Sequence, residues 1–308
     1  MGYGKTYQKE DLYSAFNKCL DKGFNFFDTA EGYANGESES LLGEFHQKDG
    51  RKIIIATKHK ATSDPKKMLK SLNDSLKRLR VEQVDLYQLH YPPSKERINE
   101  FMDMMAETVK SGKVRAVGVC NFNADRMKIA FDRLAYHGIP LASNQVFFNI
   151  MERRAEFNGV LQLCKSLDIA LIPFSPMAQG LLTGKFRKNI KKTTLSQKIY
   201  FRLQQLDIFK EDPGEKTLFQ KLINTPMVTR IDRIEPLFQF MEKLASKYVA
   251  TIPQIALNWL LSADPHVIPI PGAKNVKQAM DNIGTLRFSL THEEFNDICK
   301  LQESILAG

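Results

Sequence analysis

The stretch Asn25–Glu44, NFFDTAEGYANGESESLLGE, carries the strongest indication of the fold. The run Phe24–Phe27 is too short and too aromatic for an amphipathic helix, so it predicts a buried strand with Asp28 at its carboxyl end. Two glycines bracket Tyr33 in a loop, and residues 37–45 have the apolar spacing of a helix packed on a sheet. A carboxylate at the end of a buried strand is costly unless it is paired, so Asp28 requires a partner.

The size and charge of the chain restrict its class. It has 308 residues, 43% of them hydrophobic, which suffices for one large core or two ordinary ones. The net charge is +9, and the densest basic run is KFRKNIKK at 185–192. This run has one aromatic residue and no repeated interleaving, which favours a solvated cationic loop over a nucleic-acid patch. Attraction to a phosphorylated small molecule is a third interpretation, and we predict no nucleic-acid partner.

Cysteine usage and hydropathy indicate an intracellular protein. Four cysteines lie far apart without a CxxC pair, so neither a zinc site nor a disulfide framework is predicted. No uninterrupted apolar run approaches the ~18 residues of a membrane span, and the amino terminus lacks the layout of a signal peptide. We therefore expect no membrane contact and a cytoplasmic location, or an organellar one if an upstream transit peptide is missing. The oligomeric state is left open.

Strand-like and helix-like segments alternate along the chain with short connections. The strand-like runs are 24–28, 53–57, 84–90, 114–120, 142–148, 170–174 and 267–270. This order predicts right-handed βαβ units on a parallel sheet. The residues with chemical potential stand at the carboxyl ends of these runs: Asp28, Lys58, His90, Asn121, Gln145, Ser175 and Gly272. Spreading such residues over every strand end favours a closed (β/α)8 TIM barrel over a doubly wound sheet, whose sites cluster at one switch point.

One α/β domain is predicted over residues 1–308, because no long polar linker with a composition break separates two halves. The long insert at about 180–234 contains Pro213, Gly214 and many lysines. Loops of this length on barrels are commonly functional lids, and plain disorder is the alternative.

Four residues at or just after strand ends form a candidate acid–base site: Asp28, Tyr33, Lys58 and His90. A free tyrosine has a pKa of about 10, and a nearby ammonium lowers that value by favouring the phenolate. Lys58 is predicted to be this ammonium, and Asp28 to keep it charged. A neutral His90 imidazole could donate a hydrogen bond to a substrate carbonyl oxygen. Each residue alone has an ordinary structural explanation, so the hypothesis rests on their joint placement.

At these residues the sequence resembles the aldo-keto reductase superfamily, over about 3–306. The family's aspartate and tyrosine match those in FFDTAEGYANGESE, its lysine that in IIIATK, and its histidine that in VDLYQLH. The resemblance implies a (β/α)8 barrel, an NADP cofactor, and reduction of a small-molecule aldehyde or ketone with Tyr33 as proton donor. The main alternative is a non-enzymatic cofactor sensor, like the potassium-channel β-subunits of the superfamily, and a minor one is a cofactor-free acid–base enzyme. The intact set of four residues favours the reductase.

The resemblance also implies a nicotinamide and pyrophosphate site formed by Cys120, Asn121, Gln145, Phe174, Ser175, Met177 and Lys185. Cys120 stands where the family usually has serine, and its thiol is a weaker hydrogen-bond donor to the nicotinamide carboxamide. Phe174 falls where the family stacks an aromatic ring on the nicotinamide, with a plain core position as the alternative. Lys185 falls in the segment that wraps the pyrophosphate in this family. The basic run 185–192 therefore fits the third interpretation, attraction to a phosphorylated small molecule.

The segment IPIPGAKNVKQAMDNIG at 268–284 resembles the family's adenosine-phosphate segment. A helix that begins near Val276, after a Pro-Gly turn, directs backbone N–H groups and the positive end of its dipole toward a phosphate. The implied contacts are Gly272, Lys274, Gln278, Asp281 and Asn282. Lys274 matches the position that contacts the 2′-phosphate, which implies a preference for NADPH over NADH.

The beginning of the chain departs from the family. The family opens with a small hairpin and a first barrel strand, but nothing before Lys9 supplies an apolar run of strand length. The first strand is therefore expected to be missing: the true start lies upstream, another segment fills the space, or the fold is compromised. The substrate is also left open, since Tyr91, Phe122 and Phe148 either line an apolar pocket or pack in the core.

Overall fold

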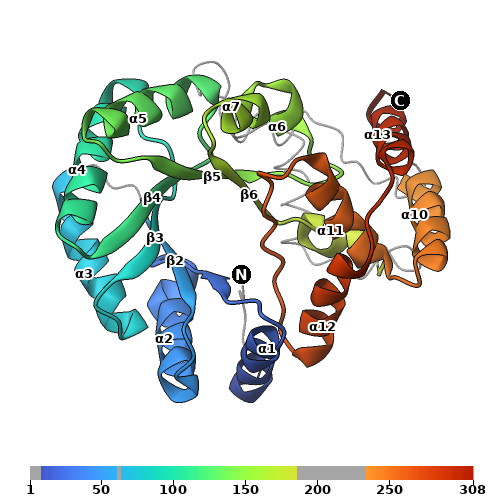
Figure 1. The fold of residues 1–308 in the computed structure, drawn as a ribbon, viewed down its shortest axis with the longest axis horizontal. Coiled ribbons are helices and arrows are strands. Elements are labelled where there is room, and N and C mark those ends of the chain that lie inside the picture. Colours follow the sequence, from blue (N-terminus) through green and yellow to red (C-terminus); the bar gives the residue numbers. More distant parts are fainter. Residues whose placement is uncertain (1–7, 61–63, 186–233, 308) are drawn as a thin grey trace, which may run out of the picture.

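The computed structural model describes residues 8–60, 64–185 and 234–307. In this part of the chain, six parallel strands form one curled sheet in the order β1-β2-β3-β4-β5-β6, and helices cover its outer side (Figure 1). The strands are β1 Phe26–Asp28, β2 Ile54–His59, β3 Val84–Leu89, β4 Val114–Cys120, β5 Leu141–Phe147 and β6 Ala170–Phe174. The predicted α/β fold of TIM-barrel type is confirmed as a curled half-barrel of strands.

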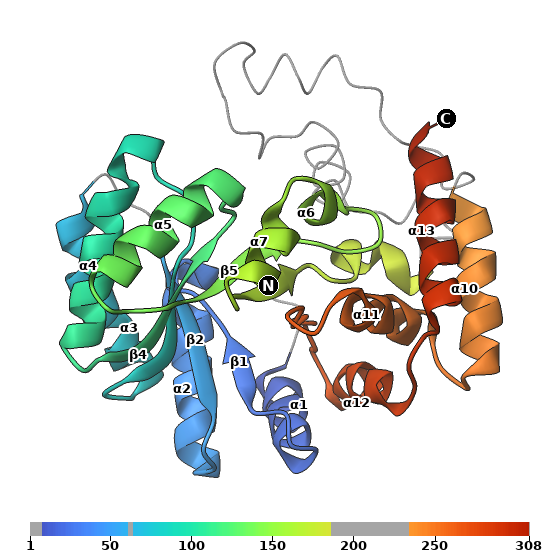
Figure 2. The ribbon, with the colours of Figure 1, turned by 45° about the horizontal axis from the view of Figure 1, so that its top comes forward.

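Helices connect the strands as predicted. They are α1 Lys9–Asp21, α2 Glu37–Asp49, α3 Met68–Leu79, α4 Ile98–Lys110, α5 Ala124–Tyr136, α6 Arg154–Phe157, α7 Val160–Ser166, α10 Glu235–Lys247, α11 Ile252–Ala263, α12 Val276–Gly284 and α13 His292–Ala307. The 3₁₀ segments are η1 Tyr33–Gly36, η2 Pro65–Lys67, η3 Lys95–Arg97, η4 Ala178–Thr183 and η7 Thr285–Arg287. The helices α10 and α13 lie side by side at one end of the molecule (Figure 2).

Two apolar clusters hold the sheet. The larger one lies between strands and helices, and its bulkiest fully buried side chains include Trp259, Tyr87, Phe101 and Phe238. The smaller one consists of Ala56, Leu86 and Ile172. Successive strand residues point to opposite faces, which is why Ile55 belongs to the first cluster and Ala56 to the second.

The segment 267–270 differs from its prediction as a regular strand. It lies beside β6, where Val267 forms a parallel bridge with Leu171, and the Ile268 amide donates to the Leu171 carbonyl over 2.9 Å. No strand is assigned to it, because Pro269 and Pro271 have no N–H group to extend the ladder. The segment is therefore correctly placed in the fold but is held by few hydrogen bonds.

One edge of the curled sheet is β1. Among the described residues, β1 pairs only with β2, and α1, which precedes it, packs against α12 (Figure 1). The prediction of a missing first strand falls on residues 1–7, which lie outside the described residues. The same holds for 186–233, most of the predicted insert, so both statements stay predictions, as does the single domain.

Candidate active site

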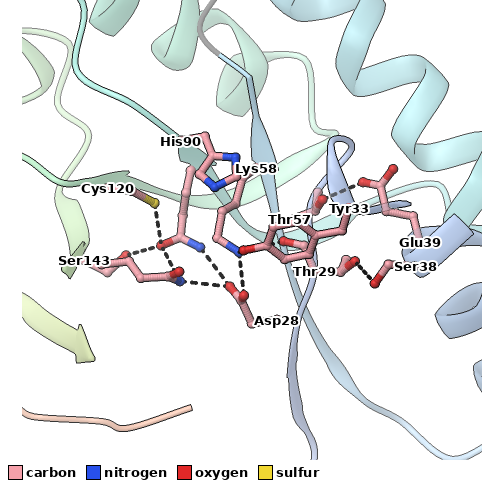
Figure 3. A network of polar contacts seen from close by, with 12 residues as sticks. Asp28, Thr29, Tyr33, Ser38, Glu39, Thr57, Lys58, His90, Cys120 and Ser143 are labelled. Atoms are coloured by element: carbon pink, nitrogen blue, oxygen red, sulfur yellow. Dashed lines mark hydrogen bonds and ion pairs between the residues drawn. The ribbon is translucent and has the colours of Figure 1, made fainter. Parts of the chain in front are cut away.

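The carboxyl ends of the first three strands bring the candidate catalytic residues together. Asp28 ends β1 opposite Ala56 of β2, and Lys58 of β2 lies opposite Gln88 of β3. His90 directly follows β3. Figure 3 shows that the carboxylate, the ammonium, the imidazole and the Tyr33 phenol gather at one place. The predicted meeting of these four residues is thus present in the structure.

A tight turn carries Tyr33 into this cluster. Ala34, Asn35 and Gly36 all have left-handed backbone conformations, with φ of 49°, 54° and 90°. The positive φ favours glycine at position 36, and a side chain there would also displace that of Arg78, whose Cδ would lie 2.7 Å away. Two non-glycine residues in this conformation store strain, which is typical of backbone at functional sites. The turn ends at Gly36, and α2 begins at the next residue, Glu37.

Lys58 is the centre of the site. Its side chain is fully buried, and its ammonium donates to Asp28 Oδ2, to the Thr29 carbonyl over 2.8 Å and to the Tyr33 hydroxyl at 3.3 Å. Burial lowers the pKa of Lys58, but Asp28, Tyr33 and Cys120 together outweigh burial, and the pKa stands above its usual value. The lysine is therefore protonated at neutral pH, as predicted.

The pKa of Tyr33 differs from the sequence-based expectation. The Lys58 ammonium lowers it, as predicted, but burial has the larger effect and raises the pKa to about 12. The expected net lowering is therefore wrong for this structure. A phenol with this pKa keeps its proton throughout the neutral range, which suits a proton donor more than a base.

His90 is neutral, as predicted. Burial and then the Lys58 charge lower its pKa to about 4. Its ring lies edge-on to Tyr33, with 5.7 Å between centroids, and stacks on Tyr91 at 4.5 Å. A neutral imidazole beside the phenol can donate a hydrogen bond to an oxygen atom that the phenol also contacts.

Gln88 is a site residue that the sequence analysis missed. Its Nε2 donates to Asp28 Oδ1 at 3.3 Å, and its Oε1 accepts from Cys120 Sγ at 3.8 Å and from Ser143 Oγ at 3.5 Å. The signal was present in VDLYQLH, because Gln88 stands two residues before His90 and thus points to the same face of the strand.

The three residues implied to hold the nicotinamide carboxamide lie next to these groups. Gln145 donates from Nε2 to Asp28 Oδ1 over 2.9 Å, and Asn121 donates from its side-chain Nδ2 to the His90 carbonyl at 3.3 Å. Cys120 is only 1% exposed, and burial raises the pKa of its thiol, so it is a neutral group. Their role toward a cofactor stays a prediction.

The segment after β6 is strained where the family resemblance implies the pyrophosphate. Ser175, Ala178 and Gln179 have φ of 50°, 47° and 52°. The Ser175 carbonyl accepts from the buried Asn149 amide over 3.1 Å, which fixes this turn. Strain of this kind at a strand's carboxyl end is typical of binding sites.

Three more residues of the implied site lie in or after this segment. Phe174 is half-buried, and its ring lies 5.3 Å from that of Phe147. Met177 is half-buried, and Lys185 is exposed.

The beginning of α12 forms the second part of the implied cofactor site. Asn275 caps the helix by accepting from the Gln278 amide over 3.0 Å, and the Gln278 side chain accepts from the Lys274 amide over 2.8 Å. The side-chain amide of Asn282 donates from Nδ2 to the Gly272 carbonyl at 3.2 Å. These bonds fix the turn, and the Lys274 side chain is exposed beside it.

Asp281 lies apart from this arrangement. Its Oδ1 accepts from Thr251 Oγ1 over 2.8 Å and from Gln254 Nε2 at 3.1 Å, so the carboxylate faces the beginning of α11. Its contact with adenosine stays a prediction.

Three residues were considered for a substrate pocket. Tyr91 is 45% exposed, but Phe122 and Phe148 are buried in the core, which is the alternative that the sequence left open.

Two exclusions hold for the described residues alone. In residues 8–60, 64–185 and 234–307, no group of three or more His, Cys, Asp or Glu residues could hold a metal ion. No helix in these ranges is long and apolar enough to cross a membrane.

Comparison with known proteins gives the family. The family model "Aldo/keto reductase family" matches residues 1–303, so the chain belongs to this family. It is 33% identical over 313 residues to pyridoxal reductase, chloroplastic, of Arabidopsis thaliana, covering 95% of this chain and 76% of that protein. The predicted membership of the aldo-keto reductase superfamily is thereby confirmed.

Solved structures agree with this assignment. Glycerol dehydrogenase AKR11B4 from Gluconobacter oxydans superposes with a TM-score of 0.76 at 28% identity, covering 97% of this chain and 86% of that one. An aldo/keto reductase from Klebsiella pneumoniae in complex with NADP and acetate has a TM-score of 0.71 at 24% identity, with 98% and 88% covered. The family uses NADP(H), as the resemblance implied.

Proposed function

We propose that the protein is an NADPH-dependent carbonyl reductase that converts aldehydes or ketones to alcohols. The observation that supports this most strongly is the position of the Lys58 ammonium, which binds the Asp28 carboxylate and lies 3.3 Å from the Tyr33 hydroxyl. A fully buried lysine, kept charged and in contact with a protonated phenol, is an arrangement for proton transfer.

The proposed chemistry divides between cofactor and protein. When bound, the nicotinamide supplies the hydride that reaches the carbonyl carbon. Tyr33 gives its proton to the carbonyl oxygen, and the Lys58 charge stabilises the phenolate that is left. Neutral His90 holds the same oxygen by a hydrogen bond, and Asp28 keeps Lys58 charged throughout.

The residues of the chain fit the cofactor at two places. The strained turn at Ser175, together with Asn121 and Gln145, lies at the carboxyl ends of β4 to β6, where the nicotinamide and pyrophosphate would bind. The capped beginning of α12 with exposed Lys274 suits the phosphate of the adenosine end. The compartment of the protein, cytoplasmic or organellar, stays a prediction.

Turnover of NADPH with a panel of aldehydes and ketones tests the proposal. The near-ultraviolet absorbance of NADPH reports its oxidation, and Tyr33→Phe, which keeps the ring but loses the proton donor, should lower kcat/KM by ~10²- to 10⁴-fold. Tyr136→Phe is the matched control, because Tyr136 is 77% exposed on α5 and should leave turnover unchanged. NADPH binding without turnover of any carbonyl would instead favour the cofactor sensor.

A further inference from the structure

The loop that carries Tyr33 rests on the end of β2. Its first residue, Thr29, donates its amide to the Ala56 carbonyl over 2.8 Å. Two residues before Tyr33, the Glu31 side chain accepts from the Lys60 amide through Oε1 over 2.6 Å. The Glu31 amide itself lies 3.5 Å from the Lys58 carbonyl, at the limit of a hydrogen bond. The Glu31 carboxylate is therefore the strong link between the loop and the strand at this point.

A buried histidine faces the same carboxylate. His59 is fully buried, and its Nδ1 lies 3.4 Å from Glu31 Oε1. Among the described residues, neither ring nitrogen of His59 has a hydrogen bond of good geometry. A buried ring nitrogen without a partner is costly, and the Glu31 carboxylate is the charged group that lies nearest to this ring. The His59 carbonyl also accepts from the His90 amide over 2.9 Å, which ties the histidine of the active site to the same strand end.

Glu31 is charged in this environment. Burial by itself raises its pKa, but His59, the Lys60 amide and the Ser71 side chain together lower the pKa below its usual value. A hydrogen bond from a backbone amide to an ionised carboxylate is roughly twice as strong as one between neutral groups. The link to Lys60 is thus charge-assisted at neutral pH.

We propose that Glu31 is a positioning residue for Tyr33. It fixes the loop on the end of β2 through the Lys60 amide and the buried His59, and so holds the phenol at 3.3 Å from the Lys58 ammonium. The inference rests on the proposed function of Tyr33 as proton donor. Glu31 acts through this residue, because a misplacement of the reacting group by ~1 Å can cost ~10²-fold in rate.

Three variants test the role in turnover. Glu31→Ala should lower kcat on the order of 10- to 10²-fold while the Kd for NADPH stays unchanged. Glu31→Gln should retain most of the activity, since its amide oxygen can accept from the same Lys60 amide. The matched control is Glu37→Ala, which removes an exposed carboxylate in the first turn of α2 and should change neither quantity. A normal kcat in Glu31→Ala would overturn the proposal.

A double-mutant cycle separates positioning of Tyr33 from a general effect on stability. If Glu31 acts through the phenol, then Glu31→Ala should cause no further loss of activity in the Tyr33→Phe background. A further loss of the same size in that background would show that Glu31 does not act through Tyr33, and would overturn the proposal.

Hydrogen exchange gives a result that does not depend on carbonyl reduction. Peptides that cover residues 29–36 should exchange faster in Glu31→Ala than in the parent, and Glu37→Ala should match the parent. Unchanged exchange in Glu31→Ala would show that the loop is held without Glu31 and would overturn the inference. Absence of carbonyl turnover in the parent, with faster exchange in Glu31→Ala, would contradict the proposed function alone.

Discussion

Gln145 on β5 donates to Asp28 on β1 over 2.9 Å, across the inner side of the curled sheet. Asp28 Oδ1 is thereby satisfied, while Oδ2 binds the Lys58 ammonium. Buried ion pairs are stable only when their remaining hydrogen-bonding groups also find partners, and Gln145 supplies one of them. The residue implied to hold the nicotinamide thus also supports Lys58, the lysine of the proposed proton-transfer site.

Asp28→Asn tests the importance of this support for stability. The substitution keeps the shape of the side chain but leaves the fully buried Lys58 without its counter-ion, so we expect a loss of about 3–5 kcal/mol in the free energy of unfolding. Urea denaturation measures this loss. Asp74→Asn is the control, because its partner Lys70 is 82% exposed, and such surface pairs contribute about 0–1 kcal/mol. Equal losses in the two variants would contradict the expectation.

The pKa values of Tyr33 and His90, the two groups proposed to contact the substrate carbonyl, predict the pH dependence of reduction. Tyr33 keeps its proton up to about 12, and His90 stays neutral down to about 4. Neither group changes its charge between these values, so kcat/KM should be flat across the neutral range, and below it should fall only as His90 gains a proton in acid. His90→Gln should be slower and should lose this acid decline. A decline centred near 6.5, the pKa of a free histidine, would contradict the burial-based assignment.

His266 should make stability pH-dependent at the opposite end of the strands. Its ring contacts Asp264 at 2.8 Å and Asp168 at 3.2 Å, and the hydrogen bond to Asp264 is the main cause of its raised pKa. The folded chain therefore binds this proton more tightly than the unfolded chain does. The stabilisation is complete below the unfolded pKa of about 6.5 and is lost as the pH rises through the raised value.

Urea denaturation at several pH values measures this effect. The difference in unfolding free energy between the parent and His266→Gln should shrink as the pH rises from acid to alkaline, while exposed His292→Gln should give no such trend. A difference that is constant with pH would mean that His266 acts only through its shape.

Much of the architecture could be predicted because local patterns decide it. Short apolar runs predicted the first six strands, and the spacing of FFDTAEGY placed Tyr33 beside Lys58 correctly. Two features depended on distant parts of the chain instead. The net pKa of Tyr33 follows from burial by the surrounding fold, and the role of Gln88 follows from partners on β1, β4 and β5. The motif VDLYQLH shows only that Gln88 shares a strand face with His90, and it does not contain these partners.

Cofactor preference rests on one exposed side chain at a fixed turn. The amide of Lys274 is bound by Gln278, and Asn275 caps α12, so the lysine is attached to a rigid backbone beside a helix N-terminus. That N-terminus attracts any phosphate through its dipole, but only the 2′-phosphate of NADPH brings an additional charge to the adenosine end. Lys274→Ala should therefore cost roughly 1–3 kcal/mol in NADPH affinity and leave NADH affinity nearly unchanged.

Fluorescence titration of both dinucleotides against the parent, Lys274→Ala and Lys277→Ala measures this preference. Lys277 is an exposed lysine on the same helix and controls for the general loss of positive charge, which should weaken both dinucleotides slightly and similarly. The parent should bind NADPH more tightly than NADH, and only Lys274→Ala should reduce that difference. Equal losses for the two dinucleotides in Lys274→Ala would mean that this lysine does not contact the 2′-phosphate, and another basic residue would then have to account for any preference for NADPH.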